Sequence, residues 1–172
     1  DANNTLFVTD GRSHKVRKFA TDGTFLGSWG SLGSGPSELD SPWGITVDDE
    51  GYVYVADHKN HRVQKFTSDG DFVAQIGGPG TKRASLSYPT DVAVDPEGDV
   101  YICTWNKNAW DRGRIQIFDA EGRFLTGLVG DAQQLSTWAE MTVAANTDYL
   151  KRRREVRSTE PEWTFAQPTA VV

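Results

Sequence analysis

The sequence predicts an all-β protein, a β-propeller of four-stranded antiparallel blades with a short helical insertion. Three observations indicate this fold. One sequence unit recurs at a spacing of 47 residues, apolar residues inside each unit follow a period of two, and turns rich in Asp and Gly separate the alternating segments. A unit of about 40 to 50 residues that contains four short strands is typical of a propeller blade.

The repeat is clearest in its turns and in its second and third strands. Asp22-Gly23-Thr24-Phe25 and Asp69-Gly70-Asp71-Phe72 lie 47 residues apart. The same offset relates three segments that we predict to be second strands: residues 6–10, 53–57 and 100–104. Three further segments correspond as third strands, the last of them after five extra loop residues: 14–19, 61–66 and 113–118. The chain therefore contains three copies of the unit.

The elements are most regular in the middle copy. Its four predicted strands, in chain order, are residues 42–48, 52–56, 62–66 and 71–76. Each segment either alternates apolar and polar residues or is a continuous apolar run, and each is bounded by a turn such as Asp49-Glu50-Gly51. Pro89 opens the corresponding first strand of the next copy, and Pro168 opens one more.

This pattern divides a single propeller domain, residues 1–172, into five parts. They are a partial blade that lacks its first strand (1–40), two complete blades (41–87 and 88–132), a helical insertion (133–164) and the first strand of a further blade (165–172). The insertion has Ser136 as a candidate N-cap, with Trp138 and Met141 at helical spacing. A second helix, over residues 149–157, would be rich in Arg.

Three motifs follow each other in the middle copy: Pro-x-Gly-Ile-x-Val-Asp (42–48), Gly-x-Val-Tyr-Val-Ala-Asp (51–57) and Asn-His-Arg-Val-Gln-Lys-Phe (60–66). In this order they resemble NHL repeats, and the resemblance covers residues 4–130. It implies an NHL-repeat β-propeller whose ring has six blades, so that three repeats make half a ring. The third copy departs most from the pattern, because Thr104 stands where Asp57 stands in the second.

Two explanations of a half ring are open. The chain is either a fragment of a longer propeller or a whole subunit that pairs with a second copy. In the second case each copy lends the strand around residues 169–172 to the exposed edge of the other's first blade. This homodimer would cover open strand edges, which otherwise invite aggregation, and a two-fold ring closes without leftover surface.

Composition argues against some classes of function. The net charge of −6 and the pI near 5.0 do not suit the wrapping of nucleic acid, which uses basic patches. No apolar run approaches the roughly 20 residues that cross a bilayer, and a single cysteine, Cys103, excludes an internal disulfide. We expect a soluble protein, for which cytoplasmic and secreted locations both stay open.

Motifs for catalysis and for metal binding are weak. The sequence has no nucleophile elbow, zinc-protease motif, Cys-x-x-Cys pair or phosphate-binding glycine loop. His14 and His61 occupy equivalent places in successive copies, which suggests a zinc site, but the third copy has no His there. Asp91 is either a ligand at the mouth of the channel or the cap of a turn, and we favour the cap. We expect no cofactor, with calcium or zinc as the alternative, because the family resembled includes metal-dependent lyases and lactone hydrolases.

Other positions recur for the architecture of the repeat. Asp10 and Asp57 end second strands, where a carboxylate accepts backbone N–H groups of the following loop and pairs with the next arginine, Arg12 or Arg62. Glycines recur at the Asp-Gly turns and at their counterpart in the third copy: Gly23, Gly70 and Gly122. We predict structural roles for these aspartates, for Arg62 and for these glycines.

The most distinctive surface feature is the lengthened loop of the third copy, where two tryptophans stand among Asn, Lys, Asp and Arg. Aromatic faces stack on sugar rings or hold apolar side chains, and polar neighbours orient the ligand. The predicted ligand-binding residues are Trp105, Asn108, Trp110 and Arg112, followed by Arg152 and Arg153 of the insertion. We predict a binding or scaffold module that presents its loop face to a protein, peptide or glycan. The alternative is a metal-dependent lyase or lactone hydrolase.

Overall fold

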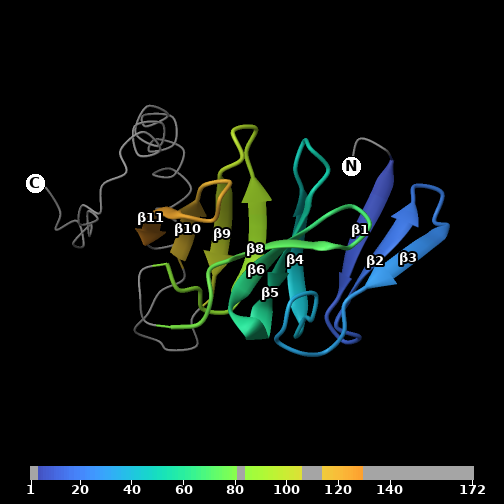
Figure 1. The fold of residues 1–172 in the computed structure, drawn as a ribbon, viewed down its shortest axis with the longest axis horizontal. Helices are drawn as coiled ribbons and strands as arrows, with labels where there is room; N and C mark the ends of the chain where they lie inside the picture. Colours follow the sequence, from blue (N-terminus) through green and yellow to red (C-terminus); the bar gives the residue numbers. More distant parts are fainter. Residues whose placement is uncertain (1–3, 81–83, 106–113, 130–172) are drawn as a thin grey trace, which may run out of the picture.

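The computed structural model describes residues 4–80, 84–105 and 114–129, which form three antiparallel sheets (Figure 1). The first sheet contains β1 (Thr5–Asp10), β2 (Lys15–Ala20) and β3 (Phe25–Trp29). The second contains β4 (Pro42–Val47), β5 (Val53–Asp57), β6 (Arg62–Phe66) and β7 (Phe72–Ile76). The third contains β8 (Pro89–Val94), β9 (Val100–Thr104), β10 (Arg114–Phe118) and β11 (Phe124–Val129). One helical turn, η1 (His58–Asn60), occurs in these ranges, and no helix in them is long and apolar enough to span a membrane.

Strands that follow each other in the chain are also neighbours in each sheet. Every neighbouring pair is antiparallel, in the second sheet and in the third alike. The predicted all-β fold of four-stranded antiparallel blades is confirmed. The predicted helical insertion at 133–164 and the strand at 165–172 lie outside the described residues.

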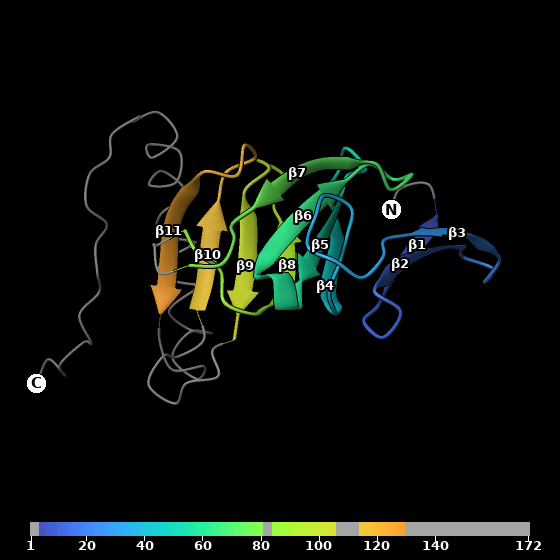
Figure 2. The ribbon, with the colours of Figure 1, turned by 60° about the horizontal axis from the view of Figure 1, so that its bottom comes forward.

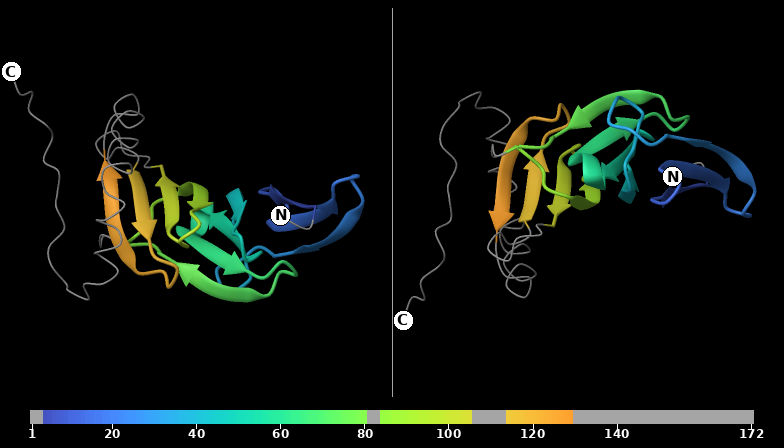
Figure 3. Two further views of the ribbon diagram at one scale, coloured as in Figure 1. Left: turned by 90° about the horizontal axis from the view of Figure 1, so that it is seen from above. Right: turned by 90° about the horizontal axis from the view of Figure 1, so that it is seen from below.

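The sheets stand side by side, with the second sheet between the other two (Figures 1, 2 and 3). On one side of this row, β4 contacts both β1 and β8. β4 and β8 begin at one end of the sheets, and β5 and β9 finish at that same end. The segments around these four strand ends therefore lie together, at the lower end in Figure 1. That end carries the candidate site.

A repeated turn joins the first and second strands of each four-stranded sheet. Asp48 accepts the Tyr52 N–H through Oδ1 at 2.8 Å and the Tyr54 hydroxyl through Oδ2 at 3.0 Å. The equivalent residues of the third sheet, Asp95, Asp99 and Tyr101, make the same two bonds at 2.8 and 3.1 Å. In both sheets one aspartate thus closes the turn and also anchors a tyrosine hydroxyl. The ring of Tyr54 packs between the second and third sheets.

The turn between the third and fourth strands needs glycine. Gly23, Gly70 and Gly122 have φ angles of +88°, +94° and +77°, a left-handed conformation that residues with a Cβ atom rarely adopt. Each N–H donates to the carbonyl oxygen three residues earlier, at 2.9 to 3.0 Å. The three glycines singled out in the sequence therefore close equivalent turns.

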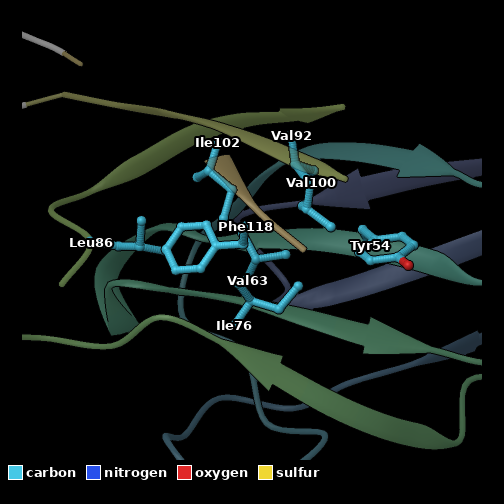
Figure 4. Packing of buried hydrophobic residues seen from close by; sticks show 8 residues of the cluster. All are labelled: Tyr54, Val63, Ile76, Leu86, Val92, Val100, Ile102 and Phe118. Atoms are coloured by element: carbon cyan, nitrogen blue, oxygen red, sulfur yellow. The ribbon is translucent and has the colours of Figure 1, made fainter. Parts of the chain in front are cut away.

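The hydrophobic core lies between the sheets. Between the first and second sheets, Phe7 and Trp29 pack against a buried cluster of Val16, Leu39, Val53, Val55 and Phe66. The second and third sheets meet in another buried cluster, shown in Figure 4: Tyr54, Val63, Ile76, Leu86, Val92, Val100, Ile102 and Phe118. Each sheet therefore depends on its neighbour, as in other repeat proteins.

The first strands of the second and third sheets meet closely at Gly44. A Cβ atom at this position would lie 2.5 Å from the Cα of Asp91 and 2.9 Å from the carbonyl oxygen of Thr90. Non-bonded atoms do not come this close without a shift of the backbone. The absence of a side chain at position 44 therefore allows β4 and β8 to pack at their present separation.

We expect Gly44→Ala to lower the free energy of unfolding by about 1–3 kcal/mol, because the added methyl group overpacks the contact between β4 and β8. Gly27→Ala is the matched control. Gly27 lies in β3 with no heavy atom within 4 Å of an added Cβ, so this change should leave stability unchanged or raise it by up to about 1 kcal/mol. Urea unfolding followed by circular dichroism measures both. Equal effects of the two substitutions would contradict the close contact.

Candidate functional site

Five aromatic residues lie in the segments where β4 and β8 begin and where β5 and β9 end, which gather at the lower end of the molecule in Figure 1. We call this set the aromatic rim: Trp43, His58, His61, Tyr88 and Trp105. They come from the start of β4, from η1 and the residue after it, from the residue before β8 and from the residue after β9. The rim therefore forms where first strands begin and second strands end.

The centre of the rim is a stacked pair. The rings of Trp43 and His58 lie 4.2 Å apart between centroids, and their planes differ by 3°. His58 Nδ1 lies 3.0 Å from the carbonyl oxygen of Pro89, and because a carbonyl oxygen can only accept, Nδ1 carries the proton. The third sheet thus holds the buried imidazole, and the imidazole supports one face of the indole.

Tyr88 connects this pair to the rest of the rim. Its ring contacts the rings of His58 and His61, at 5.3 and 4.4 Å between centroids. Its carbonyl oxygen accepts the N–H of Trp105 at 3.1 Å. Trp43 and Trp105 are 49% and 52% exposed, whereas His58 is buried. The rim therefore has two exposed indoles: the Trp43 ring stacks on the packed rings, and Trp105 is joined to Tyr88 through the backbone.

The two histidines considered as zinc ligands bind the backbone. His14 Nδ1 accepts the Ser41 N–H, and His61 Nδ1 accepts the Tyr88 N–H, both at 3.1 Å. Each bond ties a hairpin loop of one sheet to the entry of the next sheet. His14 Nδ1 also lies 3.4 Å from Asp40 Oδ1. A nitrogen that accepts a hydrogen bond carries no proton, so we assign this contact to a neutral histidine and not to an ion pair.

Within residues 4–80, 84–105 and 114–129, no group of three or more His, Cys, Asp or Glu side chains could hold a metal ion. Asp91 is exposed on β8, and its Oδ1 accepts the Val92 N–H at 2.9 Å, next to the irregularity in the pairing of β8 with β9. Burial and then the Asp91 charge raise the pKa of the Cys103 thiol. A thiol with a raised pKa stays protonated and is a poor nucleophile.

A buried clamp built on Asp57 holds the loops beneath the rim. Its carboxylate accepts the Asp40 N–H at 2.7 Å, the Arg62 Nε–H at 2.8 Å and the Gln64 amide at 3.1 Å. Asn60 donates to both carboxylate oxygens, at 3.0 and 2.9 Å. The charge is therefore paired and hydrogen-bonded on several sides, which a buried carboxylate requires.

Arg62 extends the clamp into the connector between the first and second sheets. Its NH2 group donates to the carbonyl oxygens of Gly35 and Glu38, at 2.8 and 2.9 Å, and its NH1 group donates to Gln75 at 3.0 Å. Both Arg62 and its partner Asp57 are buried. One ion pair thus fixes a connector, a hairpin and an outer strand relative to one another.

Asp10 makes a more exposed version of the clamp. It accepts the backbone N–H groups of Arg12 and Ser13, at 3.2 and 3.0 Å. Its side-chain partner is Arg17 at 2.8 Å, not the guanidinium of Arg12 expected from sequence. Arg17 occupies the repeat position of Gln64, which also binds the clamp aspartate. Hydrogen bonds from Ser13 and then from Arg17 hold the pKa of Asp10 below its ordinary value of 3.8.

Of the predicted ligand-binding residues, the structure places Trp105 in the rim. The others lie outside the described residues: Asn108, Trp110, Arg112, Arg152 and Arg153. Sequence reasoning missed Trp43 and His58 as a pair. The available signal was their departure from the repeat, since Trp43 stands where the next copy has Thr90, and His58 where the previous copy has Gly11.

Comparison with known proteins bears on the repeat and on the fold. Residues 39–66 match the family model of the NHL repeat, so the resemblance found in the sequence is confirmed. No curated protein matches the sequence.

Two solved structures show the same fold at low sequence identity. Hydrazine synthase of Kuenenia stuttgartiensis aligns with a TM-score of 0.57 at 15% identity, over 74% of this chain and 33% of that one. Virginiamycin B lyase of Staphylococcus aureus aligns with a TM-score of 0.56 at 18% identity, over 76% of this chain and 39% of that one. This chain thus spans between a third and two fifths of these structures, and at such identity the likeness shows the propeller fold alone.

We expect Asp57→Ala to lower the free energy of unfolding by about 3–5 kcal/mol, because it leaves the buried Arg62 guanidinium without its anion. Asp49→Ala changes an exposed turn aspartate and should stay within about 0.5 kcal/mol of the parent protein. Chemical unfolding of the two variants at pH 7 makes the comparison. A small loss for Asp57→Ala would show that the clamp contributes little to stability.

The Asp10 pair should give a pH-dependent contribution to stability. Because the folded-state pKa is lowered, this contribution is complete above the ordinary value of 3.8 and is lost as pH falls toward the folded-state pKa. The difference in unfolding temperature between the parent protein and Asp10→Asn should therefore be constant between pH 7 and about 5 and shrink below about 4. Thermal melts across this range test it, and a difference that grows at low pH would contradict the assignment.

Proposed function

We propose that this NHL-type propeller chain is a binding or scaffold module whose ligand surface is the aromatic rim, and that its partner is a protein, peptide or glycan. The observation that carries the proposal is the exposed indole of Trp43, supported on the buried imidazole of His58. Large exposed aromatic side chains held in place by neighbours are the usual anchors of binding surfaces.

The stack gives the indole a fixed orientation before any ligand binds. A mobile surface side chain loses rotamer freedom on binding, at a cost of about 0.5–1.5 kcal/mol. His58 reduces that cost here, because its own position is set by the bond to Pro89 at 3.0 Å. A ligand that lies on the exposed part of Trp43 therefore meets a surface that is already ordered.

The chemistry of the rim favours a ligand with a flat apolar face and polar edges. Indole rings stack on sugar rings and on apolar side chains of peptides. Beside the stack, Lys59 Nζ lies 3.6 Å from Asp40 Oδ1, so the surface next to the indole carries one positive and one negative side chain. This surface and the net charge of −6 favour a neutral or mixed-charge partner and do not suit nucleic acid.

The alternative, a metal-dependent lyase or lactone hydrolase, rests on the family resemblance. A metal site for such a reaction needs several ligands on one ion. Within the described ranges the histidine Nδ1 atoms of positions 14 and 61 bind backbone N–H groups, and no group of three candidate ligands forms. We therefore derive no metal-dependent step from these residues.

We expect Trp43→Ala to weaken binding at least about tenfold, the loss typical of an aromatic anchor. The assay screens the parent protein on arrays of oligosaccharides and of peptides and then measures the best hit by calorimetry. The same loss is expected for Trp105→Ala if both indoles touch the ligand.

Val73→Ala is the matched control for this experiment. Val73 is an exposed apolar residue on the outer strand β7, away from the rim, so its replacement should leave affinity unchanged. Unchanged affinity of Trp43→Ala with an intact fold would exclude the rim as the ligand surface, as would an equal loss for Val73→Ala.

A further inference from the structure

The outward face of the first sheet carries exposed apolar side chains beside the Asp10–Arg17 ion pair. Leu6, Val8 and Phe25 are 49%, 47% and 54% exposed, and the Phe25 ring packs on the ring of Phe19 at 5.5 Å. These residues come from all three strands of the sheet, β1, β2 and β3. A set of this kind on one sheet face normally marks an interaction surface.

The repeat shows what covers this face elsewhere. In the second sheet the positions equivalent to Leu6 and Val8 are Val53 and Val55, and both are fully buried against the first sheet. In the third sheet they are Val100 and Ile102, which are also fully buried, against the second sheet. The first sheet therefore has the same kind of residue at these positions, but no described sheet packs on this face.

The edge of the same sheet is open as well. Among the described strands, β1 pairs with β2 alone, whereas its equivalents β5 and β9 each have a strand on both sides. The additional strands are β4 and β8, which begin at Pro42 and Pro89. An edge strand with one free side is a ready template for another strand.

We propose that this edge and face receive a second copy of the same chain, whose residues 167–172 pair with β1. The segment reads Gln-Pro-Thr-Ala-Val-Val, and its proline stands at the repeat position of Pro42 and Pro89. The registers observed between the first and second strands of the second and third sheets predict one and the same pairing for this segment. Ile45 lies opposite Val55, and Val92 lies opposite Ile102. Transferred through the repeat, both place Val171 opposite Val8.

A second copy covers this surface better than residues 167–172 of the same chain would. A single added strand would cover the edge of β1 but leave Phe25, on β3 at the far edge of the sheet, in water. A second copy brings a whole sheet together with the strand, as the first sheet does for Val53 and Val55. The exchange is reciprocal, so two copies related by a two-fold axis would cover both open faces and complete a closed ring.

Disulfide trapping in the full chain tests the register. The variant carries Val8→Cys and Val171→Cys with Cys103→Ser, so that it has two thiols. Directly opposed residues on antiparallel strands have Cβ atoms about 4.5–5.5 Å apart, near the span of a disulfide. We expect oxidation to give a covalent dimer of about 38 kDa, twice the 19.0 kDa chain. The control pair Val73→Cys and Val171→Cys in the same background should give no dimer, because Val73 lies on β7 of the second sheet.

Light scattering of the unmodified chain and of Val171→Asp gives an independent readout. We expect about 38 kDa for the parent and 19.0 kDa for the variant, with circular dichroism unchanged. A parent mass of 19.0 kDa would overturn the proposal, as would larger open assemblies or a disulfide formed inside one chain. Ligand binding is not part of either measurement, so the result does not depend on the function proposed for the rim.

Discussion

Packing of one sheet against the next is the constraint on which this structure depends. Successive side chains of a strand point to opposite faces, so Val55 faces the first sheet and Tyr54 faces the third. A single sheet of three or four short strands would leave both apolar faces in water. Gly44 and Gly70 serve this packing, because an added Cβ would lie 2.5 Å from Asp91 at the first and 2.7 Å from Trp29 at the second. Stability is therefore shared between neighbouring sheets.

Polar side chains then fix the segments that run between the sheets. Buried backbone groups need partners, and the partners here come from a different sheet or connector: Asp57 for Asp40, His14 for Ser41 and His61 for Tyr88. These bonds set the entry points of β4 and β8 relative to η1. The orientation of the aromatic rim follows from them, so the supports of the candidate site are also the joints of the scaffold.

One repeat position shows how a binding surface can be built on a regular scaffold. Gly11, His58 and Trp105 are equivalent in the three copies. At Gly11 a Cβ atom would lie 3.1 Å from a carbonyl oxygen, His58 places a buried ring against the carbonyl of Pro89, and Trp105 presents an exposed ring. The backbone is shared, while the side chains differ from copy to copy. Departures from the repeat therefore coincide with the surface that we propose as the binding site.

The sequence alone determined the strands, their order and the Asp-Gly turns, because period-two alternation and turn chemistry are local properties. It also predicted structural roles for the aspartates that end second strands, and Asp57 has such a role; the ligand-binding role of Trp105 stays a prediction. Only the tertiary structure decided that Trp43 stacks on His58, since the two are 15 residues apart and meet through the irregular pairing of Pro42 and Ile45 with β5. The tertiary structure likewise decided that Asp10 pairs with the guanidinium of Arg17. Such contacts depend on the separation and orientation of segments that a local pattern does not encode.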